Sequence, residues 1–230
     1  MSQLALPLQL QDHAVFESFL PAGNEALVAY LQDLVRSRRG PGCWIHGAAA
    51  TGKTHLLQAV CERAGDSAQF LPIAQLVDAG PGLLEGLEMR QFICLDDIDH
   101  AAGNSDWELG LFALFNSLLE SGGVLICSAA GSARESDIAL ADLQSRLSTL
   151  PSFQLQPLPE ADRIAALRLR AGHRGLQLPE ETAAYLLTHS RRDMASLYLA
   201  LDRLDAEALK AQRRLTIPFV REVLGLKPRN

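Results

Sequence analysis

Eight consecutive residues have the types and spacing needed to hold a polyphosphate. The stretch 47–54 reads Gly-Ala-Ala-Ala-Thr-Gly-Lys-Thr, with two glycines that permit tight turns and point backbone N–H groups at an anion. Lys53 would reach the β- and γ-phosphates, and the Thr54 hydroxyl would take one position on Mg²⁺. We therefore expect the loop to bind ADP or ATP. The expected nucleotide-binding residues are Gly47, Ala48, Ala49, Ala50, Thr51, Gly52, Lys53, Thr54 and His55.

The segments on either side of this loop fit the same interpretation. An apolar run at 43–46 is typical of a buried strand, and residues 54–60 continue as a helix whose positive N-terminal end would face the phosphates. A chance match within a turn rich in glycine and alanine is the alternative, but it would not come with a strand before it and a helix after it. The sequence therefore predicts a nucleotide-binding site.

A second group of candidate residues follows later apolar runs. Asp96 and Asp97 come directly after one run, and Ser128 ends the next. The carboxyl ends of parallel strands meet at one edge of a sheet, beside a phosphate loop. We expect Asp96 to hold Mg²⁺ together with Thr54, and Asp97 to orient an attacking water. Ser128 could bond the γ-phosphate or that water, although polar residues that merely end a strand are the alternative for all three.

Composition restricts the class of protein. The chain has 230 residues, of which 48% are hydrophobic and 21% charged, as in ordinary soluble domains. No apolar stretch is long enough for a membrane span, and no secretion signal is recognisable, so we expect a cytoplasmic protein with no membrane partner. The four cysteines lack metal-binding spacing and fit buried free thiols; they are Cys43, Cys61, Cys94 and Cys127.

Charge is unevenly placed along the chain. The net charge is −6, with 8 Lys/Arg against 18 Asp/Glu in residues 1–158 and 13 against 9 in residues 159–230. The excess of positive charge in the second part fits either a solvated helical surface or a functional basic face. Overall acidity argues against strong binding of duplex DNA by the chain alone, because such binding relies on Lys and Arg neutralising phosphates.

Alternating strand and helix patterns predict the fold. After the run at 43–46, we expect strands at 68–73, 92–95, 124–128 and 153–156. Pro72 places the second of these at a sheet edge, because it cannot donate to a neighbour. Helical spacing is found at 25–38 and from Ser105, which we expect to cap a helix with Glu108 completing a capping box. The pattern predicts an α/β fold with a parallel five-stranded sheet.

The pattern changes after residue 158. From 161 to 224 the spacing of apolar residues is helical, with breaks at 172–175, at Ser190 and at 215–216. We therefore expect a second, small, all-helical domain.

Several motifs together resemble the DnaA branch of the AAA+ ATPases. They are Lys53-Thr54-His55, Asp96-Asp97-Ile98, the stretch 115–120, Ser128, and Leu143-Gln144-Ser145-Arg146-Leu147. The resemblance covers about residues 10–226 and implies a tail at 1–10, an AAA+ P-loop domain at 11–158 and a helical lid domain at 159–230. It also implies that Arg146 is an arginine finger acting on a nucleotide held by a neighbouring molecule, where spacing alone would make it a surface residue.

Both ends of the chain resemble the short DnaA homologues that inactivate the replication initiator. Residues 215–224 are similar to the end of those homologues, and the chain reaches Asn230 without the helix-turn-helix domain that reads origins. The resemblance implies two partners, the initiator DnaA and the DNA polymerase III sliding clamp (its β subunit), with DNA reached mostly through the clamp. It leaves a homo-oligomer open. The expected clamp-binding residues are Gln3, Leu4, Leu6, Pro7 and Leu8.

One position departs from the family pattern. Ala195 stands where the family usually has a second sensor arginine. Arg191 and Arg192 are candidates to take its place in the sequence, but their positions fall on a different side of the helix. The resemblance therefore does not imply direct coupling between nucleotide and lid, nor does it tell whether the chain hydrolyses ATP itself.

Two other classes of protein stay open. One is a helicase-loader-like ATPase that binds single-stranded DNA, which the acidic residues 1–158 disfavour; the other is a small-molecule kinase, which would need an arginine-rich lid.

Overall fold

The computed structural model describes residues 14–190 and 193–226, and its strands all fall in the first part of the chain. The strands are β1 Cys43–His46, β2 Ala68–Pro72, β3 Phe92–Asp96, β4 Val124–Ala129 and β5 Ser152–Gln154. The helices that accompany them are α1 Glu25–Ser37, α2 Lys53–Ala64, α3 Ile73–Leu76, α4 Ser105–Ser121 and α5 Ala141–Leu147. Short 3₁₀ turns complete this part, namely η1 Phe16–Ser18, η2 Gly65–Ser67, η3 Val77–Ala79, η4 Pro81–Leu84, η5 Leu87–Met89, η6 Ile98–Ala101 and η7 Ala133–Glu135.

The five strands form one parallel sheet in the order β2-β3-β4-β1-β5. In the register of the central pair, Cys43 lies opposite Ile126. The predicted five-stranded parallel sheet is therefore confirmed. So is the edge position of the strand that contains Pro72, because β2 is the first strand of the sheet.

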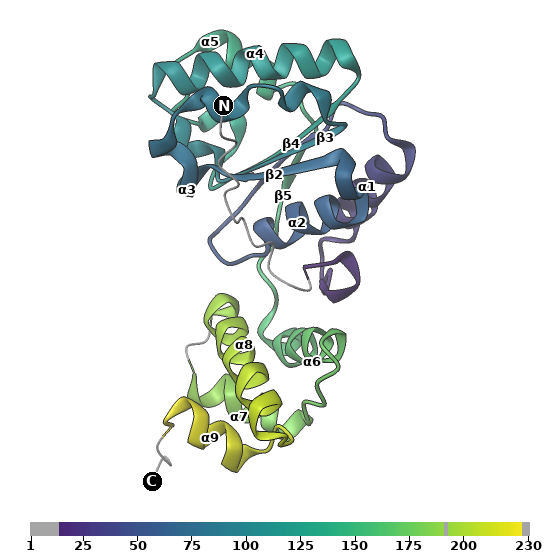
Figure 1. Cartoon of the computed structure of the whole chain (residues 1–230), viewed down its shortest axis with the longest axis vertical. Helices are drawn as coiled ribbons and strands as arrows, with labels where there is room; N and C mark the ends of the chain where they lie inside the picture. The colour runs from purple at the N-terminus through teal and green to yellow at the C-terminus, as the bar shows by residue number, and fades with distance from the viewer. Residues whose placement is uncertain (1–13, 191–192, 227–230) are drawn as a thin grey trace.

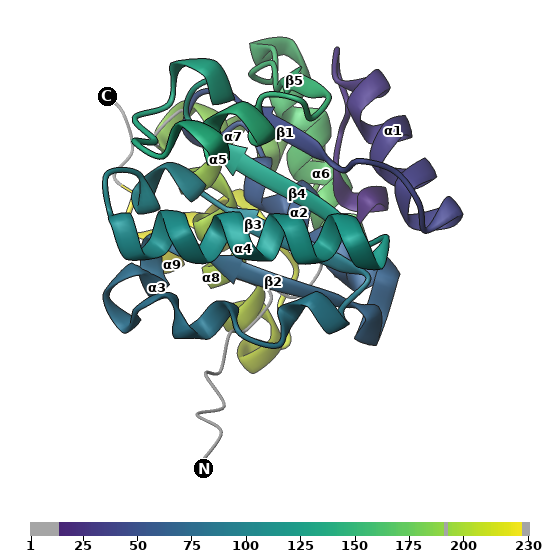
Figure 2. The same ribbon diagram turned by 90° about the horizontal axis from the view of Figure 1, so that it is seen from above.

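Helices cover both faces of the sheet, so the domain has three layers (Figure 1). Successive strand residues point to opposite faces: Ile93 packs with α3, α4 and α5, whereas Cys94 packs with α1 and α2. Seen from above, α4 runs along the sheet over β3 (Figure 2). The central strands β3 and β4 are buried at every residue, which is why they form nearly unbroken apolar runs in the sequence, whereas β5 at the sheet edge does not. All four cysteines are buried and free.

The start of α4 differs from the sequence prediction. Asn104, not Ser105, is the N-cap: its backbone is extended and its Oδ1 accepts hydrogen bonds from the N–H groups of Asp106 and Trp107. Glu108 does not complete a capping box. Its buried carboxylate instead accepts from the N–H groups of Gly103, Ala139 and Leu140. The prediction was wrong because Asn104 keeps the extended backbone of a cap while Ser105 is already helical, and Glu108 bonds Gly103 and the loop before α5.

The second part of the chain is helical, as predicted. After η8 Glu160–Asp162 it contains α6 Arg163–His173, α7 Glu180–His189, α8 Met194–Ala211 and α9 Ile217–Leu224. These four helices surround an apolar core of their own, with Leu167, Leu186, Leu201 and Val220 among its fully buried members. In Figure 1 this lid lies below the α/β domain, to which the stretch after β5 connects it. Within the described ranges, no helix combines the length and the apolar character needed to cross a membrane.

Candidate functional site

A cavity of about 840 Å³ lies between the phosphate loop and the lid. Residues 49–55 form one wall, and residues of α6 and α8 form the opposite wall. The predicted Asp97 also lines the cavity, whereas the predicted Asp96 and Ser128 lie behind it. The structure thus brings the sequence-predicted loop, acidic pair and hydroxyl to one place at the carboxyl ends of β1, β3 and β4.

The phosphate loop has the backbone that its glycines were expected to permit. Gly52 has φ of 107°, and a Cβ there would meet the ring of Phe19 at 2.7 Å. Helix α2 then begins at Lys53, so its N-terminal N–H groups face the loop. The Lys53 ammonium donates to the carbonyl oxygens of Gly47 and Ala48 at 2.9 and 3.2 Å. The loop therefore presents one ammonium group and a helix N-terminus to the cavity.

The loop is also braced internally. The Thr51 hydroxyl donates to the carbonyl oxygen of Ala48 at 2.9 Å, and a Cβ on Gly47 would lie 2.7 Å from the carbonyl oxygen of Leu155. Ala50 adopts a left-handed conformation with φ of 61°. These contacts hold the loop in one shape, which an anion-binding site requires because its N–H groups must point inward together.

Thr54 and Asp96 lie together as a pair suited to Mg²⁺. The Thr54 hydroxyl donates to Oδ2 of Asp96 at 2.7 Å. Mg²⁺ is commonly held by one or two protein oxygens plus substrate phosphates, rather than by a cage of protein ligands. Among the described residues, no group of three or more His, Cys, Asp or Glu side chains could hold a metal. The hydroxyl of Thr54 and the carboxylate of Asp96 fit a Mg²⁺ ion that is shared with a nucleotide.

Ser128 holds the acidic pair in place. Its buried hydroxyl donates to Oδ1 of Asp96 at 2.5 Å and accepts from the backbone N–H of Asp97 at 2.9 Å. Asp97 has a left-handed backbone with φ of 51°, a conformation that this hydrogen bond supports. Burial raises the pKa of Asp97, as does the neighbouring charge of Asp96, while Lys53 opposes the shift. In this arrangement Ser128 bonds the acids directly and does not face the cavity.

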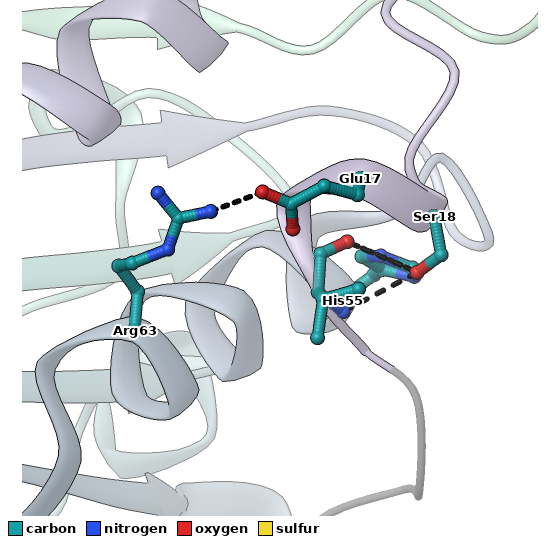
Figure 3. Close-up of polar contacts among 5 residues, drawn as sticks. Glu17, Ser18, His55 and Arg63 are labelled. Carbon is teal, nitrogen blue, oxygen red and sulfur yellow. Dashed lines mark hydrogen bonds and ion pairs between the residues drawn. The ribbon is translucent and has the colours of Figure 1, made fainter. Parts of the chain in front are cut away.

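The segment that precedes α1 covers the start of α2, which the sequence did not indicate. Nε2 of His55 lies 2.9 Å from the carbonyl oxygen of Val15. It also lies 3.3 Å from the Ser18 hydroxyl, and Figure 3 shows these two side chains together. Burial lowers the pKa of His55 to about 4, the hydrogen bond to Val15 opposes this, and the charge of Arg170 lowers it further. The ring is therefore neutral at pH 7, and its Nε2–H donates to Val15.

Two further contacts attach this segment to the rest of the molecule. Arg63 of α2 forms an ion pair with Glu17 (Figure 3), and its guanidinium lies over the ring of Phe16. Asn24 exchanges two hydrogen bonds with the backbone of Gln156, in the stretch that leads to the lid. Residues 14–24 are consequently part of the site and not merely a connection to the tail.

The lid wall differs in character from the loop wall. Ala195, predicted to stand at the second sensor position, does line the cavity, together with Tyr198 of the same helix. Arg170 of α6 lines the cavity as well and is buried. Neither Arg170 nor Tyr198 was singled out in the sequence, because nothing in the local pattern distinguishes a buried arginine from a surface one.

Arg146 lies away from this cavity. It is exposed on α5, and its guanidinium is 5.7 Å from the centroid of the Phe112 ring. The structure therefore does not bring Arg146 to the nucleotide site of its own chain. The predicted clamp-binding residues 3–8 lie outside the described residues, as do Arg191 and Arg192.

Comparison with known structures identifies the fold. Domain III of the DnaA replication initiation protein from Thermotoga maritima has a TM-score of 0.74 at 21% identity, covering 94% of this chain and 98% of that one. AMPPCP-bound DnaA from Aquifex aeolicus has a TM-score of 0.64 at 18% identity, covering 88% of this chain and 68% of that one. The RuvB Holliday junction branch migration motor from Thermotoga maritima has a TM-score of 0.60 at 13% identity, covering 89% of this chain and 69% of that one. The chain therefore shares the fold of these proteins, an α/β domain with a phosphate loop followed by a helical lid.

The lid gives the more specific assignment. Residues 160–224 match the family described as "Hda, lid domain". The lid of this chain is thus similar to the Hda lid domain, and the chain as a whole has the fold of DnaA domain III. The resemblance seen in the sequence motifs is thereby confirmed, and so is the fold class.

Proposed function

We propose that this protein is a nucleotide-binding regulator of DNA replication initiation. It would bind ADP or ATP with Mg²⁺ in its own cavity and dock on the DNA polymerase III sliding clamp through residues 3–8. From there it would present Arg146 to ATP held by the initiator DnaA, stimulate hydrolysis and so prevent re-initiation. The observation that carries the proposal is the match of residues 160–224 to the Hda lid domain.

The exposure of Arg146 supports a role on a partner molecule. An arginine finger must reach a phosphate on another chain, so it has to be exposed and remote from its own nucleotide cavity, as Arg146 is. Its guanidinium rests against the Phe112 ring, which restricts the side chain before a partner arrives. A fixed positive charge aimed at the transferring phosphoryl group is worth about 10³ to 10⁵ in rate where it has been measured.

The residues of the cavity support binding of an adenine nucleotide in cis. Lys53 and the N-terminus of α2 would bind the phosphates, and Thr54 with Asp96 would hold Mg²⁺, which when bound neutralises phosphate charge. Asp97 lines the same cavity and is the group available to orient a water. The similarity to a DnaA structure that contains AMPPCP points to adenine as the base.

The decisive assay measures ATP hydrolysis by purified DnaA in the presence of clamp, DNA and this protein. The wild-type chain should stimulate hydrolysis strongly, and Arg146→Ala should lose at least about 10³-fold of that stimulation. Arg134→Ala is the matched control, because Arg134 is an exposed arginine in η7, close before α5. Full stimulation by the Arg146 variant would refute the finger role.

The tail is tested separately by clamp capture. Leu6→Ala combined with Leu8→Ala should abolish retention of the protein on immobilised clamp, because short peptides bind through a few apolar anchors. Gln9→Ala, just beyond the predicted peptide, serves as the control and should be retained. Unchanged capture of the double variant would remove the tail from the proposal. Mass spectrometry of the nucleotide released from purified protein would establish which nucleotide it carries.

A further inference from the structure

Arg170 is a buried cation on the lid side of the cavity. It is only 3% exposed, and its guanidinium lies 4.2 Å from the centroid of the Tyr198 ring. Both side chains line the cavity. Burying a guanidinium costs free energy unless the surroundings compensate, and here burial lowers the pKa of Arg170 while Asp202 opposes that shift. Because this cation lines the cavity, Arg170 is a candidate for binding an anionic ligand there.

The surroundings of Arg170 fix its position. The ring of Tyr198 supports one face of the guanidinium by a cation–π contact. Arg174, one turn further along α6, forms an ion pair with Asp202 at 2.5 Å and lies 4.0 Å from Asp205. Asp202 therefore holds Arg174 while it also attracts Arg170. The result is an ordered cation whose placement costs little further entropy when a ligand arrives.

Arg170 and residues 49–55 of the phosphate loop line the same cavity. Its charge acts on His55, which is the neighbour of Thr54 in the first turn of α2. The other residues that the described part of the lid contributes to the lining are apolar or neutral, except for the acids Asp193 and Asp202. Within the described residues, Arg170 is thus the single positive side chain that the lid offers to an anion in this cavity.

We propose that Arg170 is the lid's contact with the phosphates of the bound nucleotide and makes the position of the lid depend on those phosphates. The proposal rests on nucleotide binding as described under Proposed function and adds the residue that links nucleotide to lid. A ligand shifts a conformational equilibrium only through contacts that differ between the two states. A guanidinium on the lid that meets phosphate only when the lid is closed supplies such a contact, and its fork geometry suits phosphate oxygens.

The test is calorimetric titration of the full chain with ADP and with adenosine. Arg170→Ala should weaken ADP binding by about tenfold or more and leave adenosine binding unchanged, because adenosine has no phosphate. Arg168→Ala is the matched control: Arg168 lies on the same helix, is exposed and pairs with Glu180. It should bind both ligands as the wild type does. Adding Ala195→Arg to Arg170→Ala should restore part of the ADP affinity, since it returns a cation to the same wall.

Two results would overturn the proposal. One is unchanged ADP affinity in a folded Arg170→Ala protein, and the other is an equal loss for ADP and adenosine, which would mean that Arg170 only supports the fold of the lid. If the alanine variant does not fold, hydrogen exchange on the wild-type chain decides. ADP should protect the α6 segment 163–173 and adenosine should not; equal protection contradicts the proposal. A wild-type chain that binds neither ligand would instead refute the nucleotide site itself.

Discussion

The α/β domain and the lid place their charged side chains in different ways. In the α/β domain, buried polar groups such as Lys53, Asp96 and Glu108 have fixed hydrogen-bond partners at short range. In the described part of the lid, the ion pairs of Arg168 with Glu180 and of Arg213 with Glu222 lie at the surface, whereas the Arg174 side chain, 6% exposed, pairs with Asp202. Because buried and fully bonded polar groups fix one geometry and exposed ion pairs contribute little, we expect polar contacts to stabilise the α/β domain more than the surface ion pairs stabilise the lid.

The largest effect on stability is expected at the buried carboxylate of α4. Glu108→Gln should lower the free energy of unfolding by about 3 kcal/mol, because an amide cannot accept all three backbone N–H groups and loses the charge that strengthens those bonds. Urea unfolding followed by circular dichroism measures it. Glu120→Gln, an exposed position on the same helix, is the control. A loss no greater than that of the control would mean that buried polar contacts do not distinguish the α/β domain.

The next effect concerns ligand binding. Lys53→Met should weaken ADP affinity by about 100-fold, since the ammonium is the charge that the phosphate loop directs at the ligand. Titration with a fluorescent ADP analogue measures the change. Lys210→Met, an exposed lysine of the lid, should bind as the wild type does. Equal affinities for the two variants would remove Lys53 from the site.

The stability of the protein should depend on pH through the buried His55 of the α/β domain. The pKa of His55 falls to about 4 on folding, so the folded state disfavours the protonated ring. Stability from this group is present above the unfolded pKa of about 6.5 and is lost as pH falls towards 4, up to about 3 kcal/mol. Thermal unfolding at several pH values should show a steeper loss between pH 6.5 and 4 for the wild type than for His55→Gln. Parallel profiles would contradict this.

A smaller effect is expected where the sequence and the structure disagree on the start of α4. Asn104→Ala should cost about 1 kcal/mol, because its side chain accepts from two backbone N–H groups at the helix start. Ser105→Ala should cost close to nothing, since Ser105 is the first helical residue and not the cap. Chemical denaturation of the two variants side by side makes the comparison, and a greater cost at Ser105 would restore the original prediction.

The smallest effect is expected at the surface of the lid. Arg168→Ala removes an ion pair whose side chains are 50% and 73% exposed, so stability should change by no more than about 0.5 kcal/mol. Thermal unfolding is sufficient to measure it. A loss comparable to that of Glu108→Gln would abolish the contrast between the two domains.

The features that could be predicted from the sequence are those with a local cause. The central strands were recognisable because a strand covered on both faces is apolar almost throughout, and the phosphate loop because its glycines, Lys53 and Thr54 lie within eight consecutive residues. Asp96 and Ser128 were found because both end apolar runs at the same edge of the sheet. In each case the residue type and its immediate neighbours contain the information.

Features that depend on the packing of distant segments could not be predicted. Asn104 and Ser105 are both good caps, and the choice between them follows from the backbone of Asn104. Phe19 shows no sign in the sequence that it covers Gly52, and Arg170 resembles any helical arginine until α6 is placed against the cavity. Such contacts join residues dozens of positions apart, and a single sequence contains no local pattern that predicts them.

The hydrogen bond between His55 and Val15 limits how far the predicted clamp-binding residues can lie from α2. Seven residue steps separate Leu8 from Val15, and a chain of that length spans at most about 25 Å when fully extended. A clamp held at residues 3–8 would therefore remain within about 25 Å of the first turn of α2, whatever path the intervening residues take. A docked clamp would therefore lie close to the nucleotide cavity. A flexible insert between Leu8 and Val15 would increase the distance between the two.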